Sequence, residues 1–356
     1  MTVVHGALDH AELAALRLEP HALLDFSSNV NPYGPPRRVA EAVAALDYGA
    51  YPDRSCFRLR QAIAELHGVD PDHVLVGNGS NELIHLLARA LLQPGDSALV
   101  IGPTFGEYAR ASELAGANVL LWCGCRDHGF QIDHVLIVER IQRQRPRLVW
   151  LCSPNNPTGI AISAEGLVAL AGACREIGSR LIVDRAYADM LRDAVPDAVD
   201  TAELHSFVIQ LHSLTKLYAL AGLRLGYLVA HHEVIERVAA YQPTWSVNSA
   251  AQAAGLAALG DKEFVRVTLP RLWQSSDQLR RELRALGLTV LPSRLPFMLV
   301  HTGNGAATRK DLLQQGCVVR DCASFGLPEY VRVAPRKPEE NLILVNTWRR
   351  LWPHQS

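Results

Sequence analysis

Short apolar segments alternate with helical stretches through most of the 356-residue chain, and this alternation is its most constraining feature. Helical periodicity separates many of these segments, as at 82–92 and 165–177. Short, continuously apolar strands between helices are typical of a mostly parallel sheet that is covered on both faces. The seven expected strands are 74–76, 98–101, 119–122, 148–152, 181–183, 208–211 and 227–230. The pattern therefore predicts an α/β fold with a mostly parallel, seven-stranded sheet.

The pattern of expected helices and strands changes after about residue 260. A long polar helix is expected at 263–286, and a closing helix from 338 to about 351. Short strands are expected near 288–291, 297–300, 318–320 and 330–333. This pattern is typical of a smaller α+β domain. We expect a large domain at 37–255 and a small domain that combines 1–36 with 256–356.

One lysine follows the strand at 208–211, in the sequence Ser-Leu-Thr-Lys at 213–216. Leucines surround Lys216, and Arg224 lies eight residues further on. Partial burial near a second cation lowers the pKa of an amine, and a neutral amine can form a Schiff base with an aldehyde. Ser213 and Arg224 offer a hydroxyl and a guanidinium suited to a phosphate. An aldehyde that carries a phosphate is pyridoxal 5'-phosphate (PLP). The alternative is a lysine that extends its charge to solvent beside a structural ion pair.

Two further segments end at the same expected edge of the sheet. Asp184 follows the strand at 181–183, where a carboxylate could pair with a protonated pyridine nitrogen or could cap a helix. The sequence Gly-Ser-Asn at 79–81 lies in a glycine-rich turn that leads into a helix. Such a turn directs the free backbone N–H groups of Ser80 and Asn81 at an anion. Ligands of open α/β sheets bind at the carboxyl ends of the strands, so we expect one site here.

Two arginines near the end of the chain lie in short apolar runs. Arg320 and Arg332 each follow a valine, so both are candidates for an inward-facing guanidinium. A buried guanidinium needs an anion, because leaving it unpaired would be costly. The anion is either a substrate group or the carboxylate of a structural salt bridge. Arg336 is the weakest candidate and is expected at a solvated rim.

These motifs resemble those of fold-type-I PLP enzymes of the class I/II aminotransferase superfamily, over nearly the whole chain. The resemblance implies that Lys216 bonds covalently to PLP, that Asp184 pairs with the pyridine nitrogen, and that Tyr187 belongs with them to the catalytic residues. It implies a homodimer with shared active sites, in which Tyr51 reaches the phosphate of the neighbouring subunit. The other residues that the resemblance assigns to the cofactor are Gly79, Ser80 and Asn81 with Ser213 and Arg224 at the phosphate, Phe105 stacked on the ring, and Asn156 at the phenolic oxygen.

The N-terminal sequence refines the resemblance. His-Gly-Ala-Leu at 5–8 and Asp-Phe-Ser-Ser-Asn-Val-Asn-Pro-Tyr-Gly-Pro-Pro at 25–36 are similar to the threonine-phosphate decarboxylase branch. Ala7 departs from the second glycine of that branch's His-Gly-Gly, and Val30 stands where histidinol-phosphate aminotransferases usually have a glutamate. The segment is expected to fold over the site; alternatively, His5 is a terminal residue without a role and the proline-rich part is only a rigid turn. The substrate residues that the resemblance implies are His5, Ser28, Asn31, Asn156, Arg320 and Arg332.

The resemblance therefore implies decarboxylation of L-threonine O-3-phosphate to (R)-1-amino-2-propanol phosphate and CO2, in cobalamin (cobamide) biosynthesis. The alternative is a PLP-dependent aminotransferase, foremost for histidinol phosphate and 2-oxoglutarate. A non-catalytic PLP-binding regulator is a third hypothesis; regulators of that kind carry a fused DNA-binding domain, which the order of the motifs disfavours.

Composition argues against other classes of function. The net charge is −1 and no run of like charges occurs, so neither nucleic acid nor an anionic membrane is an expected partner. No stretch approaches a membrane-spanning length, and the N-terminus lacks a signal-peptide pattern, so a soluble, cytoplasmic enzyme is expected. The seven cysteines are scattered, and Cys123 and Cys125 lack a second ligand pair, so no metal site and no disulfides are expected.

Overall fold

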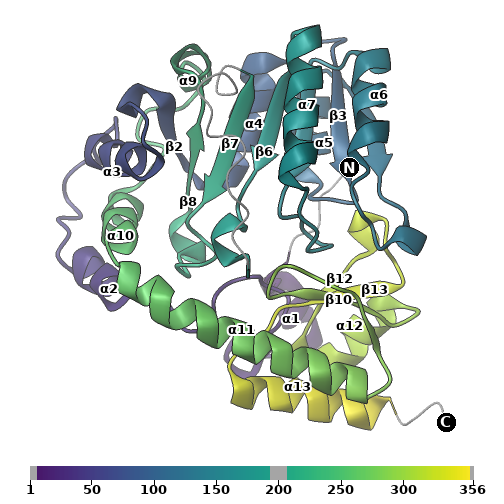
Figure 1. Cartoon of the computed structure of the whole chain (residues 1–356). Helices are drawn as coiled ribbons and strands as arrows, with labels where there is room; N and C mark the ends of the chain where they lie inside the picture. The colour runs from purple at the N-terminus through teal and green to yellow at the C-terminus, as the bar shows by residue number, and fades with distance from the viewer. Residues whose placement is uncertain (1–5, 193–206, 353–356) are drawn as a thin grey trace.

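The computed structural model describes residues 6–192 and 207–352, and His5 lies outside these ranges. A seven-stranded sheet forms the upper part of the molecule in Figure 1. Its neighbours run parallel except β8, which is antiparallel to both β2 and β7. In spatial order the strands are β2 (Val74–Asn78), β8 (Leu225–Val229), β7 (Val208–Ser213), β6 (Arg180–Asp184), β5 (Leu148–Cys152), β3 (Ser97–Gly102) and β4 (Asn118–Cys123). The predicted α/β fold and mostly parallel sheet are confirmed.

Helices cover both faces of this sheet (Figure 1). One face packs against α4 (Gly79–Leu91), α5 (Glu107–Leu114) and α9 (His232–Ala239). The other packs against α6 (His134–Gln144) and α7 (Ala164–Ile177), and at the β2–β8 end against α3 (Phe57–His67) and α10 (Ser249–Leu259). The central strands are apolar on both faces because both faces are buried, which explains why they lack an alternating pattern. Helix α4 begins at Gly79, before the predicted residue 82, so the glycine-rich turn is itself the first turn of the helix.

The C-terminal part of the chain forms the smaller α+β region. Four antiparallel strands lie in the order β12 (Arg320–Asp321), β13 (Tyr330–Val333), β10 (Met298–His301) and β9 (Thr289–Val290). Helices α11 (Lys262–Ala285) and α13 (Pro338–Leu351) lie side by side below them, and α12 (Gly305–Gln314) packs at the β12–β13 side (Figure 1). Apolar side chains from these strands and helices form a separate core that includes Phe26, Val300 and Trp348.

The N-terminal segment joins the smaller region rather than the large sheet. Strand β1 (Leu24–Asp25) pairs in parallel with β11 (Cys317–Val318), and α1 (His10–Leu16) packs its Leu13 nearby. Helix α2 (Arg37–Ala44) packs against α10 of the large region. The exact domain boundaries at 36/37 and 255/256 stay a prediction.

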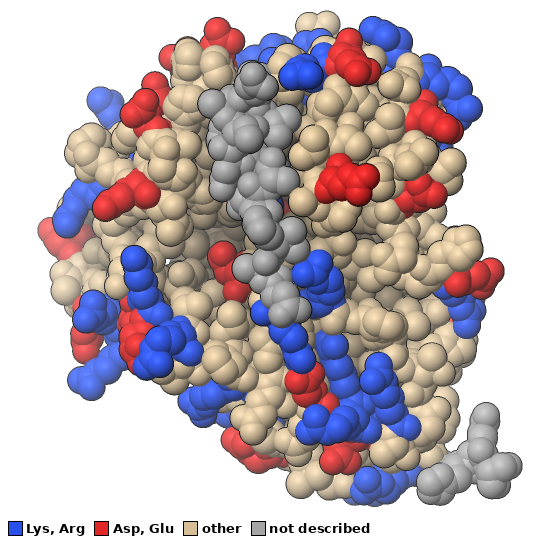
Figure 2. Space-filling model, in the orientation of Figure 1, with Lys and Arg blue, Asp and Glu red and all other residues tan. Residues whose placement is uncertain are grey.

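The visible face mixes charges of both signs (Figure 2). Lys and Arg side chains gather in its lower part, where Figure 1 draws α11. Among residues 6–192 and 207–352, no helix combines the length and the apolar character needed to cross a membrane. The cytoplasmic location stays a prediction.

Candidate functional site

A cavity of about 390 Å³ opens at the carboxyl ends of the central strands, where the large sheet meets the smaller region. It gathers side chains that the sequence places in seven separate segments. The predicted site residues in its wall are Ser28, Ser80, Asn81, Phe105, Asn156, Asp184, Tyr187, Lys216, Arg224 and Arg332. Most follow directly on a strand, as expected for a ligand site in an open α/β sheet.

Lys216 lies in the turn after β7, and the residues beside it are buried. The backbone N–H of Asn31 donates to the Lys216 carbonyl at 3.0 Å, and the Asn31 amide donates to the Leu217 carbonyl at 2.8 Å. Burial, aided by Arg332 and Arg224, lowers the pKa of the Lys216 amine from 10.5 to about 8. At pH 7.5 about a quarter of such an amine is neutral, against about one part in a thousand at the ordinary pKa. Lys216 is therefore suited to act as a nucleophile toward an aldehyde.

Asp184 ends β6 and is almost fully buried. One of its oxygens accepts a hydrogen bond from the Tyr108 hydroxyl at 2.7 Å, and the other accepts from the Ala186 backbone N–H at 2.9 Å. Burial raises the pKa of Asp184, while the bond from Tyr108 opposes that rise. Tyr108 is held in turn by stacking on Trp150, with ring centroids 5.3 Å apart. A cationic N–H group against this carboxylate would stabilise its ionised form.

An anion-binding corner lies at the start of α4. The backbone N–H groups of the first helical residues have no partner within the helix, and the helix dipole favours negative charge there. A Cβ on Gly226 would lie 2.6 Å from the Ser80 nitrogen, so only glycine lets β8 approach this corner. Arg224 passes over Gly79, whose added Cβ would lie 2.6 Å from the guanidinium. The buried Oδ1 of Asn81 has no hydrogen-bond partner. This corner can hold a phosphate.

Tyr187 and Phe105 are two aromatic residues that line the cavity. The Tyr187 hydroxyl accepts a hydrogen bond from the Asn29 amide at 3.2 Å, and its ring lies edge-on to Phe297 with centroids 5.2 Å apart. Burial raises the pKa of Tyr187 to about 12, so its hydroxyl stays protonated at neutral pH and can donate to an oxygen. Phe105 presents its ring to the cavity beside Tyr108.

Arg320 and Arg332 lie directly opposite each other on β12 and β13. Arg332 is 4% exposed and donates to the Asn156 amide oxygen and to the Ser27 carbonyl. Within the described residues no salt bridge joins it to a carboxylate, and burial lowers the pKa of its guanidinium. Arg320 donates to the Ser324 hydroxyl at 2.6 Å, and its pKa is lowered by burial and by Arg332. Like charges opposite each other destabilise a strand pair, so the pair favours an anion beside it.

The N-terminal segment closes one side of the cavity. A Cβ on Gly6 would lie 2.7 Å from the Ser27 carbonyl oxygen and 3.2 Å from Arg332, so glycine permits this close approach. The next residue, Ala7, has a φ of 89°, a conformation that favours glycine. The alanine that departs from the His-Gly-Gly pattern thus keeps the backbone conformation of a glycine. The Asp25 carboxylate accepts hydrogen bonds from the Ser27 and Ser28 hydroxyls and so holds this part of the N-terminal segment in place.

Several predicted residues lie outside the cavity wall. Gly79 lies behind Arg224, Asn31 supports the Lys216 turn, and the Ser213 hydroxyl bonds to that of Thr215 at 2.7 Å. Arg320 lines an adjoining cavity of about 630 Å³ that also reaches Arg332. Tyr51 is 81% exposed and stacks on Trp245 with ring centroids 4.8 Å apart, away from the cavity of its own chain.

Arg336 is not the solvated rim charge that the sequence suggested. It is partly buried, pairs with Glu340 at 2.8 Å and donates to the Asp25 carbonyl. Arg336 lies just before α13, which begins at Pro338, so Glu340 in the first turn of that helix is within reach of its guanidinium.

Sequence reasoning missed three residues that shape the site. They are Tyr108, which bonds Asp184; Asn29, which bonds Tyr187; and Thr215, which lines the cavity beside Lys216. Tyr108 lies in the first turn of α5 and offered no local signal of this role, because its partner Asp184 is 76 residues away in the chain. Asn29 offered none, because its partner is 158 residues away in the chain.

The side chains present fit PLP. An amine of lowered pKa, a buried carboxylate and an anion-binding helix start face one cavity, and orphaned amide oxygens of Asn29 and Asn81 leave acceptors for a ligand. An aldehyde, a protonated pyridine nitrogen and a phosphate are the groups that these three features suit.

Comparison with known proteins agrees with this chemistry. The model of the family described as aminotransferase class I and II matches residues 21–347. A histidinol-phosphate aminotransferase of Symbiobacterium thermophilum is 37% identical over 90% of this chain and 88% of its own length. A protein of Caldanaerobacter subterraneus subsp. tengcongensis with the provisional name threonine-phosphate decarboxylase is 31% identical over 91% of this chain and 89% of its own length.

Solved structures repeat both names. The histidinol-phosphate aminotransferase of Sinorhizobium meliloti, solved in complex with pyridoxal-5'-phosphate, superposes with a TM-score of 0.82 at 24% identity, covering 91% of this chain and 90% of that one. The L-threonine-O-3-phosphate decarboxylase of Porphyromonas gingivalis superposes with a TM-score of 0.80 at 25% identity, covering 92% and 99%.

Proposed function

Because the chain belongs to the aminotransferase class I and II family, a PLP-dependent family, we propose that its cavity binds PLP and converts a small phosphorylated amine. The observation that carries this proposal is the convergence of Lys216, Asp184 and Arg224 on one cavity beside the buried Arg332. PLP, when bound, supplies an aldehyde and a ring that withdraws electrons from the reacting carbon.

The residues of this chain divide the work. Lys216 holds the cofactor through its amine and, when released, can carry a proton to or from the reacting carbon. Asp184 keeps a proton on the pyridine nitrogen, and the Tyr108 hydroxyl fixes the orientation of that carboxylate. The Tyr187 hydroxyl would donate a hydrogen bond to the phenolic oxygen, and the start of α4 would hold the phosphate with Arg224.

The arginine pair sets the substrate class. Arg332, buried and without a carboxylate partner among the described residues, suits a carboxylate of the substrate, and Arg320 suits a second anionic group nearby. The N-terminal segment covers this end of the cavity, so it limits the size of the substrate and excludes water.

Transamination is the reaction that the relatives support best. In this reaction histidinol phosphate supplies the amine and a phosphate. 2-Oxoglutarate accepts the amine, leaves as glutamate, and supplies the carboxylates for Arg332 and Arg320. The support is the 37% identity to a histidinol-phosphate aminotransferase and the same name among other relatives.

Decarboxylation of L-threonine O-3-phosphate is the second candidate. The N-terminal segment favours it, because Val30 lines the cavity where histidinol-phosphate aminotransferases usually place a glutamate. A relative and a solved structure carry that name as well. In a threonine phosphate held by both arginines, the Cα–carboxylate bond, rather than the Cα–H bond, would stand perpendicular to the plane of the ring.

A product assay decides between the two. The PLP-loaded enzyme is incubated with histidinol phosphate plus 2-oxoglutarate and, separately, with L-threonine O-3-phosphate, and the products are identified by mass. We expect glutamate in the first reaction. Faster formation of 1-amino-2-propanol phosphate in the second reaction would replace transamination by decarboxylation. If Lys216→Ala matched the wild type in both reactions, the PLP proposal itself would be wrong.

A further inference from the structure

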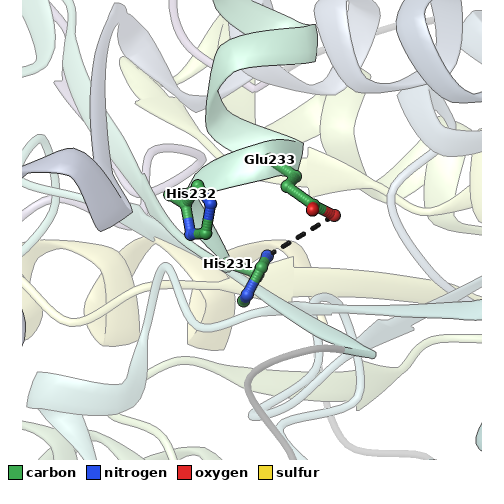
Figure 3. A group of neighbouring side chains, drawn as sticks. All are labelled: His231, His232 and Glu233. Atoms are coloured by element: carbon green, nitrogen blue, oxygen red, sulfur yellow. Dashed lines mark ion pairs between the residues drawn. The ribbon is translucent and has the colours of Figure 1, made fainter.

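A second cluster of ligand-type side chains lies at the far end of the sheet from the cavity. His231 and His232 precede and begin α9, and Glu233 follows them (Figure 3). Their ring nitrogens and carboxylate oxygen all lie within 4.8 Å of one another, and this is the one group of three such residues in the described parts of the chain. The Glu233 side chain points back at His231, with Oε2 at 3.9 Å from Nδ1.

A third histidine faces the same cluster from another segment. The ring of His73 lies 5.9 Å from that of His231 and 5.9 Å from that of His232, centroid to centroid. The backbone N–H of Ala230 donates to the His73 carbonyl at 3.0 Å, which fixes the two segments against each other. Asp72 Oδ1 lies 3.7 Å from His73 Nε2, so a carboxylate lies beside this ring without a hydrogen bond to it.

From this geometry we propose that His231, His232 and Glu233 bind a divalent transition metal ion of the zinc type, and that the His73 ring rotates toward them to complete the site. Imidazole nitrogens with one carboxylate are ligands that Zn²⁺ accepts in tetrahedral sites, at about 2.0–2.2 Å. Ligand atoms around such an ion lie about 3.4 Å apart, so small rotations of the half-exposed rings close the site. The positive end of the α9 dipole opposes a cation, and the carboxylate of Glu233 offsets it.

The proposed site differs from the expectation, drawn from the sequence, that the chain has no metal site. The spacing of the residues in the sequence did not indicate it. His73 and His231 are 158 residues apart, and they meet because β2 begins where β8 ends. The same pairing places the site away from catalysis. Ser80 and Arg224 lie beyond the opposite ends of β2 and β8, which is about 20 Å at the rise of an extended strand.

The ion would therefore join α9 to edge strand β2 and stabilise the fold without entering the reaction. We expect chelator-treated, PLP-loaded enzyme without a histidine tag to bind one Zn²⁺ per chain when titrated with ZnCl₂ alone. The double variant His231→Ala/His232→Ala should lose affinity about tenfold or more, and His73→Ala less. Excess Zn²⁺ should raise the Tm of the wild type by about 2 °C or more, and should not raise that of the double variant.

Control variants test whether Zn²⁺ affinity depends on this cluster rather than on any histidine beside a glutamate. His21 lies 4.0 Å from Glu19, as His231 lies 3.9 Å from Glu233, but it belongs to no such cluster, so His21→Ala should bind Zn²⁺ like the wild type. Glu233→Gln, at a side chain that is 76% exposed, should fold normally and still lose affinity. No saturable binding by the wild type, or equal affinity in the double variant, overturns the proposal. A large change in kcat on adding Zn²⁺ would overturn the separation from the active site.

Discussion

The two sides of the cavity are built in different ways. The cofactor side comes from the ends of strands in one sheet, and its carboxylate has local donors, because Asp184 accepts hydrogen bonds from Tyr108 and Ala186. The substrate side combines both ends of the chain, and its buried Arg332 is bonded to neutral oxygens of Ser27 and Asn156. The carboxylate of the cofactor side is hydrogen-bonded before a substrate arrives, whereas the guanidinium of the substrate side has a charge that a substrate must balance. The difference separates what fixes the chemistry from what selects the substrate.

The largest expected effect is on the cofactor side. Asp184→Asn removes the carboxylate that holds a proton on the pyridine nitrogen, and we expect kcat to fall by about 10²–10³-fold with the fold intact. Steady-state kinetics on PLP-loaded protein measures it. Asp277→Asn, which removes a carboxylate paired with Arg192 outside the cavity, is the matched control and should keep full activity. Unchanged turnover in Asp184→Asn would remove the residue from the mechanism.

The second prediction concerns the charge of the Lys216 amine, whose pKa is affected by arginines of both sides of the cavity. The pKa of Lys216 is lowered from 10.5 to about 8, so the protonated amine destabilises the cofactor-free folded protein. This loss of folding stability is complete below pH 8 and disappears as the pH rises toward 10.5. Cofactor-free Lys216→Met should therefore be more stable than the wild type at pH 7, by about 3 kcal/mol. Urea unfolding across this pH range measures the gap, which should close at high pH.

A constant gap between the two proteins would contradict the lowered pKa. Lys262→Met, at an exposed lysine that begins α11, is the control and should show no such trend. Adding Arg332→Ala should narrow the gap, because Arg332 is one cause of the lowered pKa.

Removing Arg332 tests the substrate side. Arg332→Ala should raise KM for the carboxylate-bearing substrate by about 10–100-fold, since a hydrogen bond to a charged group contributes about 1.5–3 kcal/mol. Arg320→Ala should have a smaller effect, because its side chain lines the adjoining cavity. Cofactor affinity, measured by PLP absorbance, should remain unchanged in both variants. If the two variants lost as much affinity for PLP as for the substrate, the proposed division into a cofactor side and a substrate side would be wrong.

The smallest expected effect tests whether a neighbour completes the cofactor side. Family members are typically homodimers, and Tyr51 is exposed beside Trp245, outside the cavity of its own chain. Tyr51→Ala should weaken PLP binding about tenfold, the loss of one contact to a charged group. Co-refolding Tyr51→Ala with Lys216→Ala should give more activity than the two variants separately, because a heterodimer has one intact site. With heterodimers confirmed, no gain would show that Tyr51 serves its own chain.

The same division explains what the sequence could predict. Lys216, Asp184 and the turn at Gly79–Asn81 follow apolar strands, and parallel strands bring their carboxyl ends to one edge. Their convergence was predictable from local patterns. Tyr108 and Asn29 act through partners 76 and 158 residues away, which no local pattern encodes. Ser213 and Asn31 also form hydrogen bonds in the Lys216 turn, with Thr215 and Leu217, which motif position does not encode; their roles at a ligand stay predictions.

The pairing of β1 with β11 has a consequence for the time at which the site can form. Leu24 pairs with Cys317, 293 residues later in the chain. At about 5–20 residues per second on the ribosome, β1 waits about 15–60 s for its partner. The large sheet can assemble during this interval, since its last strand, β8, ends at Val229. A nascent enzyme can therefore hold its cofactor corner well before it can close over a substrate.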